Sequence, residues 1–115
     1  MTVIGIAVTI DEKGVASYSS ESKQVASDGT ITIEIGESAS ITFAPASGQS
    51  WMFQSPWISI VSKTPGIQDV TLTSGGSDAV TIADSNPAGT KASSYTYTLS
   101  TTVGNLDPAI LNKGR

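Results

Sequence analysis

The chain has 115 residues, with ten acidic and six basic side chains, a net charge of −4, and neither cysteine nor histidine. It therefore lacks the nitrogen and sulfur ligands of zinc, iron–sulfur and haem sites, and the base of a Ser-His-Asp triad. The acidic balance, with no run of basic residues, argues against nucleic acid or a membrane surface as a partner. We expect a protein that is not an enzyme and that binds no metal or cofactor.

Length and composition predict one domain spanning residues 1–115. Twelve Ile and eight Val against four Leu favour strands over helices. The apolar segment 2–10 alternates with a period of two, which indicates a strand and not a signal peptide. No apolar run reaches the length of a membrane span. We expect the chain to be cytoplasmic or part of an assembled particle.

The clearest predicted hairpin joins residues 30–35 to residues 38–43 through a turn at Gly36 and Glu37. Both segments alternate between apolar and polar residues, so one face of each is expected to point into the core. The expected inward residues are Ile31, Ile33, Ile35, Ala39, Ile41 and Phe43.

The remaining elements predicted in chain order are also strands. They are a short strand at 58–62, a hairpin joining Val70 and Leu72 to Val80 and Ile82, a strand at 95–101 and a last strand at 109–111. Turn-forming residues separate these strands at intervals of roughly 8 to 15 residues, a spacing typical of sandwiches. We therefore predict an all-β fold, an antiparallel Greek-key β-sandwich of seven to nine strands.

An aromatic segment, 51–57, provides the first candidate site. Exposed rings of Trp51, Phe53 and Trp57 could stack on a sugar or anchor a protein partner. The alternative is that they belong to the core, because positions 51 and 53 share one face of an extended chain and large rings usually become buried.

Two tyrosines on one face of the 95–101 strand suggest a structural hydrogen bond. Either Tyr95 or Tyr97 is expected to form a tyrosine corner, with its hydroxyl bonded to backbone near residues 84–88. Acidic and amide side chains are frequent in turns because they hydrogen-bond nearby backbone, and none has the spacing of a calcium loop.

The segment after residue 106 provides the second candidate site. Asp107 and Pro108 are expected to set a turn or to lead an edge strand. Proline cannot donate to a strand ladder, so the strand at 109–111 is expected at a sheet edge or a barrel seam. If Ile110 and Leu111 dock on a neighbouring subunit, this segment is an assembly tail.

Two stretches together resemble the cupredoxin-like sandwich: 29–43, with the sequence GTITIEIGESASITF, and 94–99, with the sequence SYTYTL. In that family His, Cys and usually Met hold copper. The corresponding loop here, residues 100–107, offers none of these ligands, so the resemblance implies the fold without the metal. An immunoglobulin-like sandwich gives much the same strand pattern.

Residues 106–113, with the sequence LDPAILNK, are similar to the tail of the DP-EP proteins. These are short, β-rich bacterial proteins without a known activity. The resemblance implies bacterial relatives and assigns no function.

The function expected from these observations is a non-enzymatic structural or protein-interaction module. It would act by self-assembly, as a homo-oligomer, or by docking on a larger particle such as a virion or a secreted assembly. Charged residues make up 14% of the chain, so copies would repel one another weakly. The alternative is a carbohydrate- or peptide-binding module that uses Trp51 and Trp57.

Overall fold

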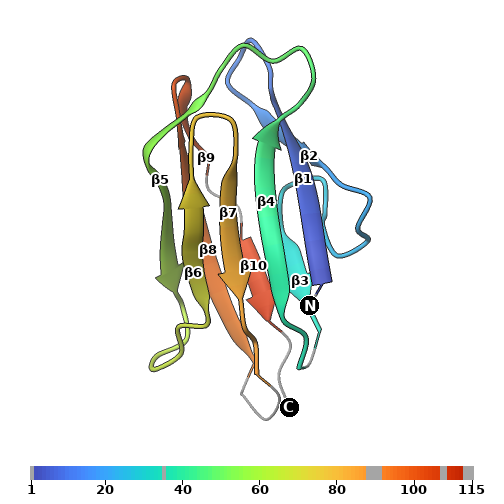
Figure 1. Cartoon of the computed structure of the whole chain (residues 1–115), viewed down its shortest axis with the longest axis vertical. Helices are drawn as coiled ribbons and strands as arrows, with labels where there is room; N and C mark the ends of the chain where they lie inside the picture. Colours follow the sequence, from blue (N-terminus) through green and yellow to red (C-terminus); the bar gives the residue numbers. More distant parts are fainter. Residues whose placement is uncertain (1, 35, 88–91, 107–108, 113–115) are drawn as a thin grey trace.

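The computed structural model describes residues 2–34, 36–87, 92–106 and 109–112, and within them every regular element is a β-strand (Figure 1). The strands are β1 (Thr2–Ile10), β2 (Ala16–Ser19), β3 (Ile31–Ile33), β4 (Ala39–Pro45), β5 (Phe53–Ser62), β6 (Val70–Gly75), β7 (Val80–Asp84), β8 (Ser93–Thr101), β9 (Gly104–Leu106) and β10 (Ala109–Asn112).

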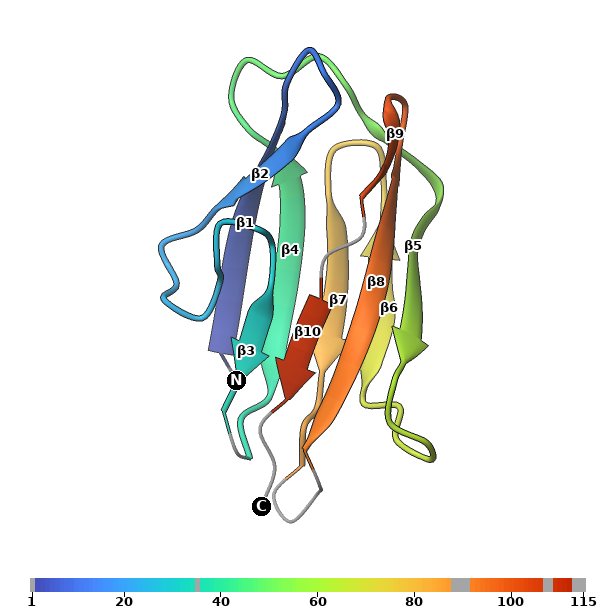
Figure 2. The same ribbon diagram turned by 180° about the vertical axis from the view of Figure 1, so that it is seen from behind.

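The strands form two sheets. Sheet A has the order β2-β1-β4-β7-β6, and sheet B has the order β3-β10-β8-β5, with β9 pairing with β8 off this path. The sheets face each other, so the prediction of an all-β sandwich is confirmed (Figures 1 and 2). Two pairs, β1 with β4 and β3 with β10, are parallel, and the other pairs are antiparallel.

The core lies between the sheets and is built by strand alternation. On β1, the inward residues Ile4, Ile6 and Val8 are at most 2% exposed. Across the core, the ring of Phe43 on β4 lies 5.3 Å from that of Tyr97 on β8, measured between centroids. Burying one such side chain stabilises the fold by about 1.5–3 kcal/mol. Apolar packing between inward faces is therefore what holds the two sheets together.

The predicted hairpin between β3 and β4 is wrong, although its described inward residues are all buried. β3 pairs with β10 in sheet B, whereas β4 pairs with β1 and β7 in sheet A. The chain crosses between sheets near Gly36, whose φ of 70° suits a residue without a Cβ. An alternating pattern specifies which face of a strand is buried, but not which strand lies beside it. The β6–β7 hairpin is confirmed.

The last strand lies inside sheet B, so the expected edge position is wrong. β10 pairs with β8 on one side and with β3 on the other, and β9 continues along the same side of β8 (Figure 2). Pro108 precedes β10, so the ladder loses no donor within the strand. Ile110 is fully buried and cannot dock on a neighbour. Asp107, Pro108 and the Leu111 side chain lie outside the described residues.

Both tyrosines of β8 are structural, but their partners differ from those predicted. The hydroxyl of Tyr95 accepts a hydrogen bond from the Asp69 amide at 3.0 Å, and that of Tyr97 donates to the Gly29 carbonyl at 2.9 Å. Burial raises the pKa of Tyr97 far above its usual value, so its hydroxyl remains protonated and neutral. Each hydroxyl ties sheet B to a loop distant in sequence.

Candidate interaction surfaces

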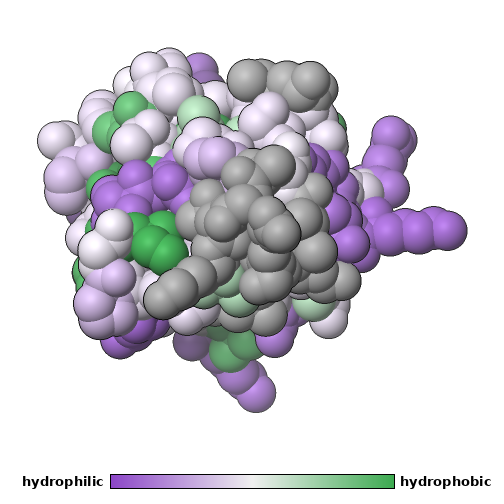
Figure 3. Space-filling view, turned by 90° about the horizontal axis from the view of Figure 1, so that it is seen from below, coloured by the Kyte–Doolittle hydropathy of each residue, from purple (hydrophilic) through white to green (hydrophobic). Residues whose placement is uncertain are grey.

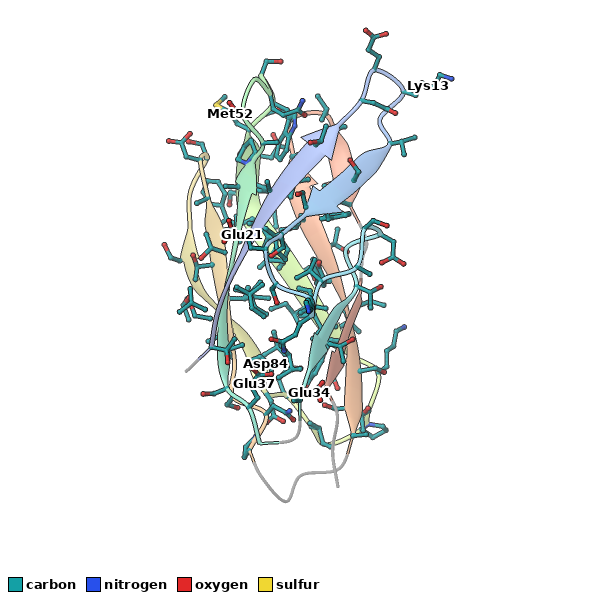
Figure 4. All side chains as sticks on the ribbon, turned by 90° about the vertical axis from the view of Figure 1, so that its right-hand side faces the viewer. Lys13, Glu21, Glu34, Glu37, Met52 and Asp84 are labelled. Atoms are coloured by element: carbon teal, nitrogen blue, oxygen red, sulfur yellow. The ribbon has the colours of Figure 1, made fainter. Side chains whose placement is uncertain are left out.

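Charged side chains are separated from the strands. Among the residues that the structure describes, Asp84 is the only charged residue within a strand, and it is 1% exposed at the last position of β7. Figure 4 shows Lys13 at the upper end of the sandwich and Glu34, Glu37 and Asp84 at the lower end. The outward faces of both sheets are consequently uncharged.

The outer face of sheet A, called here the A face, consists of small residues. Its members share an outward position on the strands of sheet A. They are Val3, Gly5, Ala7, Thr9, Ser17, Ser19, Ser40, Thr42, Ala44, Thr71, Ser74, Thr81 and Ala83. The hydroxyls of Thr42 and Thr81 lie 3.0 Å apart and bond across neighbouring strands. A flat face of short side chains lets another surface approach the backbone closely.

The A face has one prominent side chain and one hollow. Val3 is 77% exposed. Two residues along the same strand, Gly5 forms part of a hollow of about 470 Å³ whose lining includes Ala7, Thr42 and Glu21. Glu21, on the segment after β2, is the charged residue of this lining, and Figure 4 labels it at mid-height of the sandwich.

The outer face of sheet B, called here the B face, is also uncharged where it is described. Its outward residues include Ser94, Thr96 and Thr98 on β8, with Ser59 and Val61 on β5. Val61 is 51% exposed.

The aromatic segment is mostly core, which corrects the suggestion that its rings form a binding platform. Trp51 and Phe53 are 6% and 2% exposed, and their rings pack edge to face with centroids 5.1 Å apart. Trp57 is half-buried on β5, where its indole lies against Gly75. The two tryptophans therefore do not present a common exposed surface.

A hollow of about 550 Å³ lies at the upper end, between the β1–β2 turn and residues 48–51. Its lining includes Trp51 and Gln49. The Gln49 side-chain oxygen accepts hydrogen bonds from the Ile10 amide at 2.8 Å and from the Trp51 indole at 2.6 Å. Because the polar group of Trp51 is already bonded within the chain, it is not available to a ligand.

At the lower end, Glu37 joins three separate segments. Its carboxylate accepts hydrogen bonds from the Thr2 hydroxyl at 2.6 Å, the Gln24 side-chain amide at 2.7 Å and the Glu34 backbone amide at 3.0 Å. Partial burial disfavours the charged form, but these bonds outweigh it and lower the pKa of Glu37. Seen from below, hydrophilic side chains project beyond the outline of the sandwich (Figure 3). Glu37 therefore has a structural role in fixing the crossing between sheets.

Among the described residues, no three His, Cys, Asp or Glu side chains gather in a way that could hold a metal ion. No helix in the described ranges is long and apolar enough to cross a membrane.

Comparisons with known proteins identify no family. No protein-family model matches the chain. No curated protein matches it. Among solved structures, it is similar to the solution structure of amebosin with a TM-score of 0.36 and 20% sequence identity, over 76% of this chain and 89% of amebosin.

The two sheet faces were not predicted from the sequence. The sequence patterns indicated aromatic residues and the segment after residue 106, but not the outward positions of β1. A signal was present, because charged residues are absent from every predicted strand except for the segment 30–35, which contains Glu34. The absence of charged residues from the predicted strands is sufficient to predict two uncharged sheet faces.

Proposed function

We propose that this protein is a non-enzymatic interaction module that works through the uncharged faces of its sandwich, by self-assembly or by docking on a larger particle. The observation that carries the proposal is the confinement of charge to the turns and ends. A solvated charge must lose water when it enters an interface, and an unpaired one costs several kcal/mol. Faces of Ser, Thr, Ala, Gly and Val avoid that cost.

Composition supports the same proposal. Interface cores in proteins are depleted of charged residues, and their rims are polar. The sandwich repeats this arrangement, with uncharged faces bordered by charged ends. Its net charge of −4 leaves only weak repulsion between copies. A virion or a secreted assembly built from repeated copies would suit such a module, and the DP-EP-like residues 106–113 are compatible with a bacterial setting.

The carbohydrate- or peptide-binding alternative has less support. It relied on two exposed tryptophans, whereas Trp51 is 6% exposed and its indole is bonded to Gln49. Trp57 alone offers part of one ring.

Light scattering coupled to size-exclusion chromatography tests the proposal. We expect the mass to rise as the protein concentration increases from micromolar to millimolar. We expect sodium chloride to leave this association unchanged, because screening weakens contacts between charges and not between uncharged faces. Sulfate should strengthen it. A mass that stays monomeric throughout, or association abolished by sodium chloride, contradicts the proposal.

A further inference from the structure

We infer that the Trp57 side chain holds closed the side of the sandwich between β5 and β6, called here the β5–β6 side, and that withdrawal of its indole opens this side while the rest of the fold stays intact. β5 and β6 are the end strands of sheets B and A along one side of the molecule, with β2 and β3 along the other (Figures 1 and 2). Because β5 and β6 belong to different sheets, contacts other than a strand ladder must close this side. Such an opening is independent of any contact at the outer faces.

The opposite side is closed by backbone hydrogen bonds from one segment. The Ser27 carbonyl accepts a hydrogen bond from the Tyr18 amide of β2 at 3.1 Å, and the Gln24 carbonyl accepts one from the Thr32 amide of β3 at 2.9 Å. Residues 24–27 thus bind an end strand of each sheet. Opening on that side would have to break these bonds together.

The β5–β6 side is closed by a single backbone bond and a ring contact. At the upper end, the Phe53 amide donates to the Ser77 carbonyl, just after β6, at 3.1 Å. Four residues further along β5, the half-buried Trp57 indole packs on Gly75 of β6. Closure here therefore depends heavily on one side chain.

Leu72 shows that the core is incompletely covered on this side. It pairs with the buried Ile82, so its side chain faces the space between the sheets, yet it is 41% exposed. Ile60 and Trp57 on β5 are also only partly buried where they pack against the core. Displacement of Trp57 therefore enlarges an existing opening and does not have to breach a sealed core.

The indole occupies space that Gly75 leaves empty. Gly75 pairs with the buried Val80, so a side chain at this position would point between the sheets. A Cβ built there would lie within 2.9 Å of the indole Cδ1, Cγ and Nε1 atoms of Trp57, which is closer than such contacts normally come. The closed position of the indole is therefore possible only because residue 75 is glycine.

The backbone of Trp57 favours release of the indole. Its φ is 72°, in the left-handed region, which is strained for a bulky side chain and persists only where the surrounding structure imposes it. β5 also shifts its register with β8 between Phe53 and Ile58, so regular pairing does not hold the backbone of Trp57 in place. Withdrawal of the indole relieves this strain and offsets part of the packing that is lost.

Native-state hydrogen exchange compares the two sides directly. The Phe53 amide reports on the β5–β6 side and the Thr32 amide on the opposite side, because each donates a hydrogen bond there. After correction for intrinsic rates, the Phe53 amide of the wild type should exchange about tenfold faster than the Thr32 amide, since local opening exposes only the former. Trp57→Ala should increase this ratio by about tenfold again. Equal protection of the two amides in the wild type, or an unchanged ratio in Trp57→Ala, overturns the inference.

A matched pair of glycine variants tests the ring contact without removing an apolar side chain. Gly75→Ala should displace the indole, whereas a Cβ at Gly76 meets only the Ala79 carbonyl oxygen, at 3.7 Å, which is an ordinary contact. Iodide should quench tryptophan fluorescence more strongly in Gly75→Ala than in Gly76→Ala, and Trp51, 6% exposed, should contribute little to the difference. The Phe53 amide should exchange about tenfold faster in Gly75→Ala alone. Equal quenching and equal exchange in the two variants overturn the inference.

A second pair of variants covers the case in which Gly75→Ala does not fold. Trp57→Gly and Trp57→Ala both remove the indole, but only glycine adopts a φ of 72° at little cost. Trp57→Gly should therefore have the higher melting temperature, the reverse of the usual order of these two residues in a strand. Both variants should expose the Phe53 amide. A lower melting temperature for Trp57→Gly, or an unchanged Phe53 amide in both variants, overturns the inference.

Discussion

The middle of the sandwich and its lower end are stabilised in different ways. In the middle, apolar side chains from both sheets pack with no charge among the described strand positions apart from Asp84. At the lower end, Glu37 gathers donors from Thr2, Gln24 and Glu34. The charged hydrogen-bond acceptor Glu37 thus lies at the end of the sandwich, where the chain passes from one sheet to the other. The outer faces are left without groups that must remain hydrated.

The largest effect is expected from removing packing in the middle. Phe43→Ala should lower the free energy of unfolding by about 3–5 kcal/mol, because it leaves a cavity against Tyr97. Ser40, an outward residue of the same strand, should alter stability by less than about 0.5 kcal/mol when it is changed to Ala. Urea unfolding of both variants checks this. Equal losses would show that packing between the sheets does not dominate.

A smaller decrease in the free energy of unfolding is expected when only a buried hydroxyl is removed. Tyr97→Phe keeps the ring against Phe43 but leaves the Gly29 carbonyl without its donor. The expected loss is about 1–3 kcal/mol, the usual cost of an unsatisfied buried group. Amide hydrogen exchange should localise the loosening to the loop around Gly29. Unchanged stability would mean that water replaces the hydroxyl at no cost.

Weakening the three hydrogen bonds of Glu37 should lower the free energy of unfolding by a smaller amount again. Glu37→Gln replaces a charged acceptor of three hydrogen bonds, and we expect a loss of about 1–2 kcal/mol because the site is partly open to water. Glu12→Gln, in the exposed β1–β2 turn, is the matched control and should unfold like the wild type. Urea unfolding at neutral pH distinguishes the two. A loss in both variants would indicate a general effect of charge.

The smallest expected effect is on how the stability of the fold depends on acidic pH. The pKa of Glu37 is lowered from its ordinary value of 4.5 in the folded state, so its stabilising contribution is present above that value. The contribution is lost as the pH falls below 4.5 through the folded-state pKa. Melting temperatures measured over this range should fall less steeply for Glu37→Gln than for the wild type. Identical slopes would exclude Glu37 as the titrating group.

Sequence patterns predicted strand faces better than strand neighbours. The alternation correctly placed Ile31, Ile33, Ile41 and Phe43 inward because burial imposes a period of two on any strand. It misplaced the partner of β3 because a glycine with positive φ permits a crossing between sheets as readily as a turn within one. The β6–β7 hairpin was predictable since its two strands are adjacent in both sequence and sheet.

The candidate site was less predictable than the fold. Trp51 and Phe53 were recognised as either core or contact residues, and only packing could decide between the two. Ile110 was assigned to a possible docking tail since its pairing with β8 and β3 depends on contacts distant in sequence.

The position of β10 has a consequence for biosynthesis. Because β10 lies between β3 and β8, sheet B cannot be completed until β10 has left the ribosome. Domains generally fold as units during synthesis. Until β10 is available, β3 and β8 each lack the hydrogen-bonded neighbour that β10 provides along one edge. Premature termination before residue 109 would leave both strands with an open edge, and quality-control proteases should degrade such fragments selectively.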